Sequence, residues 1–440
     1  MSLPQTNRKI NLLQATAINM IDMVGIGPFV VMPLVAAQFG NGLFIWAWIF
    51  GAFTALIDGM IWSELGAKYP LAGGTYNFHR IAYGERGGRL MSFLFVWQTS
   101  IQAPLVVASA AIGFSQYLTY LVDLTLLQQK LVSAGLIILV LILLYRKIET
   151  VGKISVIFGS IVIVTITWII ITGLSHQQHA VKLWPEDGET KNILSLAFGA
   201  PMAYSAVKTV YSYLGYYNVC HLGGEIRRPE VNIPRSIFIS IAGIAVLYLL
   251  MNVAVMGVVH YQSINVNDKY LVSTFMEKLY GHRAGSAITV LILCIAMSSL
   301  FAVVLGYSRV PYAAAVDGNF FKIFGRLHPT KGFPYISLVV LCGLGLIFSL
   351  FMKLSEVITA ILAMRIVIQF IGQAVGVVLL RARFGSKDLP FRMWLFPVPV
   401  ILSISIWLFL FVSTGWFAVW GSLIAVAGVI TYAITRDRRQ

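Results

Sequence analysis

The sequence has 440 residues, of which 58% are hydrophobic and only 11% are charged, and its mean hydropathy is +0.82. A chain this apolar is not a soluble protein of several domains, and its composition places it in a lipid bilayer. The formal net charge of +15 would suggest nucleic acid binding in a soluble chain, but here the basic residues follow the membrane topology, and no nucleic acid partner is expected.

A membrane-spanning helix needs roughly 20 mostly apolar residues. Twelve such segments follow one another, and they begin near Leu12, Gly42, Leu90, Leu126, Gly152, Ile193, Ile233, Ala284, Pro334, Val357, Trp394 and Gly415. The sequence therefore predicts an all-α integral membrane protein with a single polytopic domain over residues 1–440. The stretch from Trp394 to Ile434 is almost continuous, so eleven spans are the alternative.

Two of the predicted spans are interrupted in their middle. The first breaks at Gly25-Ile26-Gly27-Pro28, and the sixth breaks around Gly215 in the segment 213–218. Helices broken at matching positions in two halves are typical of secondary transporters built from inverted repeats, which bind substrate where the breaks bare backbone groups. The pair of breaks predicts a transporter, and the alternative for the first is a proline kink between packed helices.

Basic residues gather on one side of the predicted spans. Of the 32 lysines and arginines, 22 lie in segments on the same side as the N-terminus, 7 lie on the opposite side and 3 lie within spans. The positive-inside rule therefore places both termini in the cytoplasm. Because Cys220, Cys294 and Cys342 all lie within predicted spans, no disulfide-linked ancillary subunit is expected. Asn19 and Asp22 interrupt the first apolar stretch, which we interpret as a retained span rather than a signal peptide.

The sequence contains no phosphate-binding loop, no Gly-x-Ser-x-Gly elbow and no Cys-x-x-Cys pair, so it has no candidate constellation for ATP hydrolysis or nucleophilic catalysis. His176 and His179 lack a nearby third ligand, which argues against a metal site. No enzyme activity and no cofactor are predicted, and transport would be driven by a gradient or by exchange. The polar stretch 69–84 has apolar residues at helical spacing and should lie along the inner membrane interface, with an ordinary cytoplasmic loop as the alternative.

Three groups of residues carry a resemblance to a known family. They are Glu64-Leu65-Gly66, Pro70 and Gly73-Gly74-x-Tyr76; Gly224-Glu225-x-x-x-Pro229 with Ile233-Pro234-Arg235; and Ser308-Arg309 leading to Asp317-Gly318 and His328-Pro329. The chain resembles the amino acid-polyamine-organocation transporters. Within that family it is most similar to the bacterial amino acid permeases. The resemblance implies a LeuT-type fold of twelve helices, with one repeat over about 10–175, an inverted repeat over about 190–382 and two further helices over about 393–435. Helices 1 and 6 would be unwound at mid-membrane. Where members commonly read Gly-Ser-Gly-Ile-Phe, this chain reads Gly25-Ile26-Gly27-Pro28-Phe29 and lacks the serine hydroxyl.

An amino acid brings two opposite charges into the site, and each needs a complementary partner there. The first half-helix should end near Val24 with carbonyl groups free for an ammonium, and the second should begin near Pro28 with amides free for a carboxylate. Gly25 and Gly27 permit close backbone approach. Asp22 lies on nearly the same helical face as Gly25. The predicted substrate-binding residues of this span are Asp22, Val24, Gly25, Ile26 and Gly27.

The sixth span offers several phenols around its break, and their bulk favours a small or medium substrate. Its predicted substrate-binding residues are Tyr211, Ser212, Tyr213, Leu214, Gly215 and Tyr216. Possible gating residues are Tyr217, Arg365 and Gln102, and the alternative for Arg365 is a structural partner buried between helices. Packing and interfacial anchoring are the alternative for about half of the tyrosines.

Lys153 opens the fifth span, where the resembling family often carries a lysine in place of a sodium ion. Its ammonium is predicted to tie helix one to helix eight near Ser298 and Ser299, which implies sodium-independent transport. The alternative is a lysine that snorkels to the interface. Asp22 pairs with Lys153 or Arg365 or receives a cationic substrate group, and the sequence leaves these possibilities open.

The leading functional hypothesis is a sodium-independent amino acid carrier of the cytoplasmic membrane that works by alternating access, as an exchanger or a proton symporter. The nearest rival is a polyamine or other organic-cation carrier, which Asp22 and the phenol faces favour. A membrane sensor without transport activity is a third possibility, although its usual soluble signalling domain has no counterpart in this sequence.

Overall fold

The computed structural model describes residues 8, 10–39, 43–71, 73–145, 151–181, 199–260, 263–265 and 268–437, with only the backbone described at 151–159 and 436–437. The described residues form helices joined by turns, and the isolated bridge between Ile10 and Ile226 is their one β-type pairing. This confirms the prediction of an all-helical chain.

The helices of the first half are α1 (Leu12–Met23), α2 (Gly27–Phe39), α3 (Phe44–Lys68), α4 (Thr75–Ala82), α5 (Gly84–Leu118), α6 (Leu126–Leu144) and α7 (Val151–Ser175). Those of the second half are α9 (Ala200–Tyr213), α10 (Asn218–His221), η2 (Gly223–Glu225), α11 (Pro229–Met256), α12 (Leu271–Tyr280), α13 (His282–Tyr307), α14 (Arg309–Val316), η4 (Lys322–Gly325), α15 (Tyr335–Phe351), α16 (Leu354–Arg365), the π-helical turn η5 (Ile366–Ile371) and α17 (Gly372–Phe384). The last two are α18 (Val398–Ser413) and α19 (Trp416–Asp437).

Every predicted apolar segment contains a helix. In the part of the chain that the structure describes, seven helices are long and apolar enough to cross a membrane. Helix α1 with α2, bent by 49° at their junction, makes eight if that pair is one span. Helices α15 and α18 and the described part of α7 are apolar but shorter, and the sixth segment is divided between α9 and α10. The count of twelve spans goes beyond these criteria and stays a prediction.

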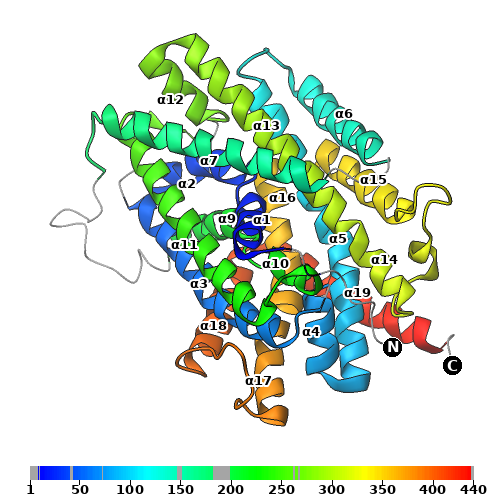
Figure 1. Ribbon diagram of the computed structural model, residues 1–440. Helices are drawn as coiled ribbons and strands as arrows, with labels where there is room; N and C mark the ends of the chain where they lie inside the picture. Colours follow the sequence, from blue (N-terminus) through cyan, green and yellow to red (C-terminus); the bar gives the residue numbers. More distant parts are fainter. Residues whose placement is uncertain are drawn as a thin grey trace.

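The broken helices occupy the centre of the bundle. In Figure 1, α1, α9 and α10 lie in the middle, with α3 and α11 on one side and α5 and α13 on the other. Contacts agree with this view, because α1 packs on α11 and α7, while α9 packs on α2, α3 and α16. Apolar side chains from these helices form one large buried cluster around the breaks.

The short helix α4 links the residues that carry the family resemblance. The Tyr76 hydroxyl donates to Asp317 Oδ2 at 2.6 Å, and Arg80 forms an ion pair with the same carboxylate. The Gly73 amide donates to the carbonyl of His221 at 2.9 Å. Burial lowers the pKa of His79 to about 4, so its neutral ring donates from Nε2 to the Ile368 carbonyl, 3.0 Å away. Helix α4 and the turn before it therefore connect α10, the C-terminal end of α14 and η5.

Candidate functional site

The first break separates α1 from α2. Helix α1 ends at Met23, the amide of Val24 closes it with a 2.9 Å bond to the Met20 carbonyl, and α2 starts at Gly27. Among the described residues, the amides of Gly25, Ile26 and Gly27 have no hydrogen-bond acceptor. Pro28 follows in the first turn of α2, where its lack of an N–H costs nothing. The break thus presents free donors at a helix N-terminus, a site that favours negative charge.

The second break lies against the first. Helix α9 ends at Tyr213, Leu214 is extended, and Gly215 has φ +123°, in the region that favours glycine. A methyl group added at Gly215 would lie 2.7 Å from the backbone of both Asp22 and Met23. The two interruptions, nearly 200 residues apart in the chain, therefore meet at van der Waals distance.

Two side chains that sequence reasoning missed hold the breaks together. The Tyr248 hydroxyl on α11 lies 2.9 Å from the Met23 carbonyl and 3.2 Å from the Ser212 carbonyl, where α1 and α9 end. The Asn19 side chain of α1 accepts from the Val219 amide at 2.9 Å, in the first turn of α10. These bonds satisfy helix-terminal groups that would otherwise be buried without a partner.

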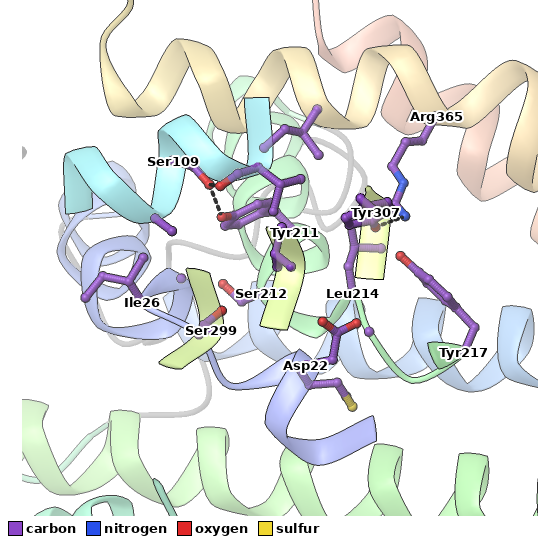
Figure 2. Close-up of a pocket in the computed structure, with 18 residues that line it drawn as sticks. Asp22, Ile26, Ser109, Tyr211, Ser212, Leu214, Tyr217, Ser299, Tyr307 and Arg365 are labelled. Atoms are coloured by element: carbon purple, nitrogen blue, oxygen red, sulfur yellow. Dashed lines mark hydrogen bonds between the residues drawn. The ribbon is translucent and has the colours of Figure 1, made fainter. Parts of the chain in front are cut away.

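A cavity of about 60 Å³ lies between the two breaks. Its lining comprises Asp22, Met23, Gly25, Ile26 and Gly27 from the first break; Tyr211, Ser212, Leu214, Gly215 and Tyr217 from the second; Val106, Ser109 and Ala110 of α5; Ser299, Val303 and Tyr307 of α13; and Ile361 and Arg365 of α16. Figure 2 shows side chains from all these elements pointing into one space. One water molecule needs roughly 10–15 Å³ of such space, so the cavity accommodates only a few non-hydrogen atoms in this conformation.

One end of the cavity carries hydroxyl groups. Ser109 donates to the Val106 carbonyl at 2.8 Å, so the Tyr211 hydroxyl, 2.9 Å from Ser109 Oγ, is the donor in that contact. The Ser299 hydroxyl of α13 faces Gly25 so closely that a methyl group there would lie 2.7 Å from Ser299 Oγ. Among the described residues it has no hydrogen-bond partner. Ser299 on α13 thus brings a free hydroxyl group to the first break, whose own residues 25–28 carry none.

The opposite end of the cavity carries two charges. Arg365 donates to the Tyr307 hydroxyl at 2.9 Å and to Gln369 at 3.0 Å, and its guanidinium lies over the Tyr217 ring at 5.3 Å. Asp22 projects toward the same space from the other side (Figure 2). It has neither a hydrogen bond nor an ion pair within 4 Å to any described residue. An acidic and a basic side chain therefore border the cavity without forming an ion pair with each other.

Several predicted site residues lie outside the lining. Val24 and Tyr213 are buried, the latter against Trp48 and Tyr248. Ser298 donates back to the Cys294 carbonyl at 2.6 Å, so its neighbour Ser299 faces the cavity instead. Gln102 is buried on α5. The side chain of Lys153 lies outside the described residues, and its predicted tie to helix eight stays a prediction.

Tyr216, another predicted binding residue, points away from the cavity. Its hydroxyl donates to Asp58 Oδ2 at 2.6 Å. Indole groups of Trp62 and Trp407 donate to the same carboxylate at 2.8 Å and 3.1 Å, and Ser403 lies 3.4 Å from it. The structure places Asp58 as an anchor that joins the second break to α3 and α18.

Lys208 on α9 contacts the first turns of α16. It is 1% exposed, and it donates to the Ser355 carbonyl and to the Thr359 hydroxyl, the latter at 2.7 Å. Its Nζ also lies 5.1 Å from the centre of the Tyr204 ring. Lys208 therefore fixes α9 to the start of α16, one turn before Tyr211.

The sequence is similar to known transporters over most of its length. A family model described as amino acid permease matches residues 10–435. The serine/threonine exchanger SteT of Bacillus subtilis is 26% identical over 90% of this chain and 89% of its own. The human cystine/glutamate transporter is 25% identical over 91% of this chain and 79% of its own length. The methylthioribose transporter of B. subtilis is 22% identical over 98% of this chain and 94% of its own length. These relatives are transporters rather than enzymes.

Proposed function

The chain belongs to the amino acid permease family and is a multi-pass membrane protein, and on this premise we propose that it carries small amino acids across the membrane. One observation carries the proposal: the two helix breaks meet around a single cavity that has free amides at one place and an unneutralised carboxylate at another. The size of the cavity favours small substrates, and a serine/threonine exchanger is among the relatives.

The charges of a bound amino acid suit this arrangement. Its carboxylate would accept from the amides of Gly25, Ile26 and Gly27 at the start of α2, with the Ser299 hydroxyl as a further donor. Its ammonium would lie toward the carbonyl end of α1 and the Asp22 carboxylate. Each charge then meets its complement, which offsets the cost of leaving water.

Transport would proceed by alternating access in the cytoplasmic membrane, with the termini in the cytoplasm and the twelve helices of a LeuT-type arrangement. The α1–α2 and α9–α10 segments would move against α5, α13 and α16, which supply the rest of the lining. Tyr211, Tyr217 and Arg365 would gate the cavity. We propose sodium independence because of Lys153, and either exchange or proton symport as the driving process.

The test is uptake in proteoliposomes of a panel of radiolabelled amino acids and diamines, with and without sodium and a pH gradient. We expect saturable uptake of a small neutral amino acid that does not need sodium. Counterflow with an unlabelled amino acid on the opposite face would identify exchange. Binding without flux under every gradient would contradict a transporter and favour a sensor.

Gly27→Val is expected to prevent substrate binding. The space at Gly27 is narrow, since an added methyl group would lie 3.1 Å from Tyr211 Cε1 and 3.7 Å from Ser212 Oγ. Valine would fill the cavity and cover the free amides. The measurement is substrate binding by scintillation proximity on purified protein. Gly135→Val is the control, because nothing lies within 4 Å of Gly135, and unchanged affinity in Gly27→Val would remove these amides from the site.

An amine carrier is the second candidate function. It is favoured by Asp22, which forms no ion pair with any described residue. A carboxylate without an ion-pair partner among the described residues is a natural acceptor for an alkylammonium. The two candidates differ in competition assays. Inhibition of uptake by putrescine but by no neutral amino acid would establish the amine carrier, whereas inhibition by alanine or serine would retain the first proposal.

A further inference from the structure

A second cavity, far in sequence from both breaks, lies at the junction of α17 and α18. Its volume is about 810 Å³, and its lining includes Arg381, Ser386, Arg392, Trp394 and Leu395. None of the residues that line it is acidic. The segment 385–397, which forms one wall, carries Lys387, Asp388 and Arg392, and Arg383 precedes it at the end of α17.

The wall of this cavity is held in place. Arg381 is fully engaged by Glu64, with Nε–Oε1 and Nη2–Oε2 distances of 2.7 Å and 2.5 Å, and the Met393 amide donates to Glu64 Oε2 at 2.8 Å. The Trp394 ring stacks on Phe238 of α11, with ring centres 5.6 Å apart and an angle of 16° between the planes. The cavity is therefore a built feature of the fold.

One positive charge in the lining is unused. Arg392 is exposed, and its guanidinium has no hydrogen-bond or ion-pair partner among the described residues. The Arg381 charge, by contrast, is neutralised by Glu64. The cavity thus offers one free guanidinium and the Ser386 hydroxyl, both of which are suitable donors for a phosphate.

An exposed apolar surface continues directly from the rim. Leu395 is 81% exposed and Trp394 60% exposed, and Ile401 on the first turns of α18 is 59% exposed. Val398 at the start of α18 is also 50% exposed. In a multi-pass membrane protein, an exposed apolar surface of this kind is suited to contact with lipid. Aromatic and basic side chains together are typical of the headgroup level of a bilayer.

We propose that this cavity binds the headgroup of an anionic phospholipid, with the phosphate against Arg392 and the acyl chains along Leu395, Val398 and Ile401. Basic pockets at the ends of membrane helices on the cytoplasmic side are suited to acidic headgroups. The absence of acidic residues from the lining and the continuity with the lipid-facing side of α18 select a lipid over a soluble anion. The bound lipid would brace the end of α17, whose other end continues through η5 to Arg365 in the substrate cavity.

The test is native mass spectrometry of the detergent-solubilised full-length protein, titrated with phosphatidylglycerol or with phosphatidylcholine of the same chain length. We expect tighter binding of phosphatidylglycerol. Arg392→Gln should raise its apparent Kd about fivefold, as for the loss of one basic residue near a membrane surface. Because Arg392 has no partner to lose, the variant is expected to fold normally. Arg326→Gln, which removes an exposed arginine after η4, is the matched control and should leave the Kd unchanged.

Three outcomes would overturn the proposal. Equal binding of the neutral lipid would show that charge plays no part. Equal weakening by Arg326→Gln would show that the lipid responds only to net charge. Displacement of phosphatidylglycerol by millimolar inorganic phosphate would identify a site for a free anion instead. These readouts do not depend on substrate uptake, so the lipid site and the transport function can fail separately.

Discussion

Gly215→Ala is expected to abolish substrate uptake while leaving the protein in the membrane. An alanine at φ +123° is strained by about 1–3 kcal/mol. Its methyl group would also lie 2.7 Å from the backbone of Asp22 and Met23, atoms that cannot rotate away as a side chain can. The two breaks would have to separate, and the cavity between them would lose its shape.

The strain and the contact can be measured separately. Gly318 also has positive φ, +75°, but nothing lies within 4 Å of a methyl group placed there. Gly318→Ala therefore introduces an alanine at positive φ without the contact between the breaks. We expect normal proteoliposome uptake for Gly318→Ala and none for Gly215→Ala, at equal amounts of monodisperse protein by size-exclusion chromatography. Normal uptake by both variants would show that the meeting of the breaks is not needed for transport.

The positions of the helices were predictable because hydropathy and glycine or proline breaks are local signals. The predicted start at Leu12 matches α1, and that at Leu126 matches α6. The break at Gly25-Ile26-Gly27-Pro28 was visible since two glycines and a proline interrupt the helix pattern. The start of α5 was predicted near Leu90 and lies at Gly84, because the polar first turn continues the helix before the apolar stretch begins.

The side chains around the cavity were predictable only in part. Tyr248, Ser109 and Tyr307 come from other helices, and a hydroxyl in an apolar helix is equally typical of helix packing. Tyr216 was predicted to bind substrate, yet it faces Asp58. The chain is not helical at Leu214 and Gly215. The helical repeat of α9 therefore does not predict the direction of side chains after the break. Which face a residue presents there depends on dihedral angles that the sequence does not reveal.

Glu64→Gln is expected to destabilise the protein by about 3–5 kcal/mol, the usual cost of removing one partner from a buried ion pair. The Glu64 side chain is 3% exposed and that of Arg381 is 8% exposed. The variant leaves the Arg381 guanidinium buried without a counter-charge and weakens the bond from the Met393 amide. The effect can be measured as a lower melting temperature of the detergent-solubilised protein.

A double mutant and an exposed pair provide the controls. Glu64→Gln combined with Arg381→Gln removes both charges, so it should recover part of the stability lost in the single variant, as is usual when a buried pair is replaced rather than broken. Asp317→Asn breaks the Arg80–Asp317 pair, whose side chains are 45% and 35% exposed, and should cost about 1 kcal/mol or less. If Glu64→Gln were no more harmful than Asp317→Asn, the contact between α3 and α17 would not be a buried ion pair. Arg381 would then be free to contribute its charge to the lipid cavity, and the phosphate would no longer depend on Arg392 alone.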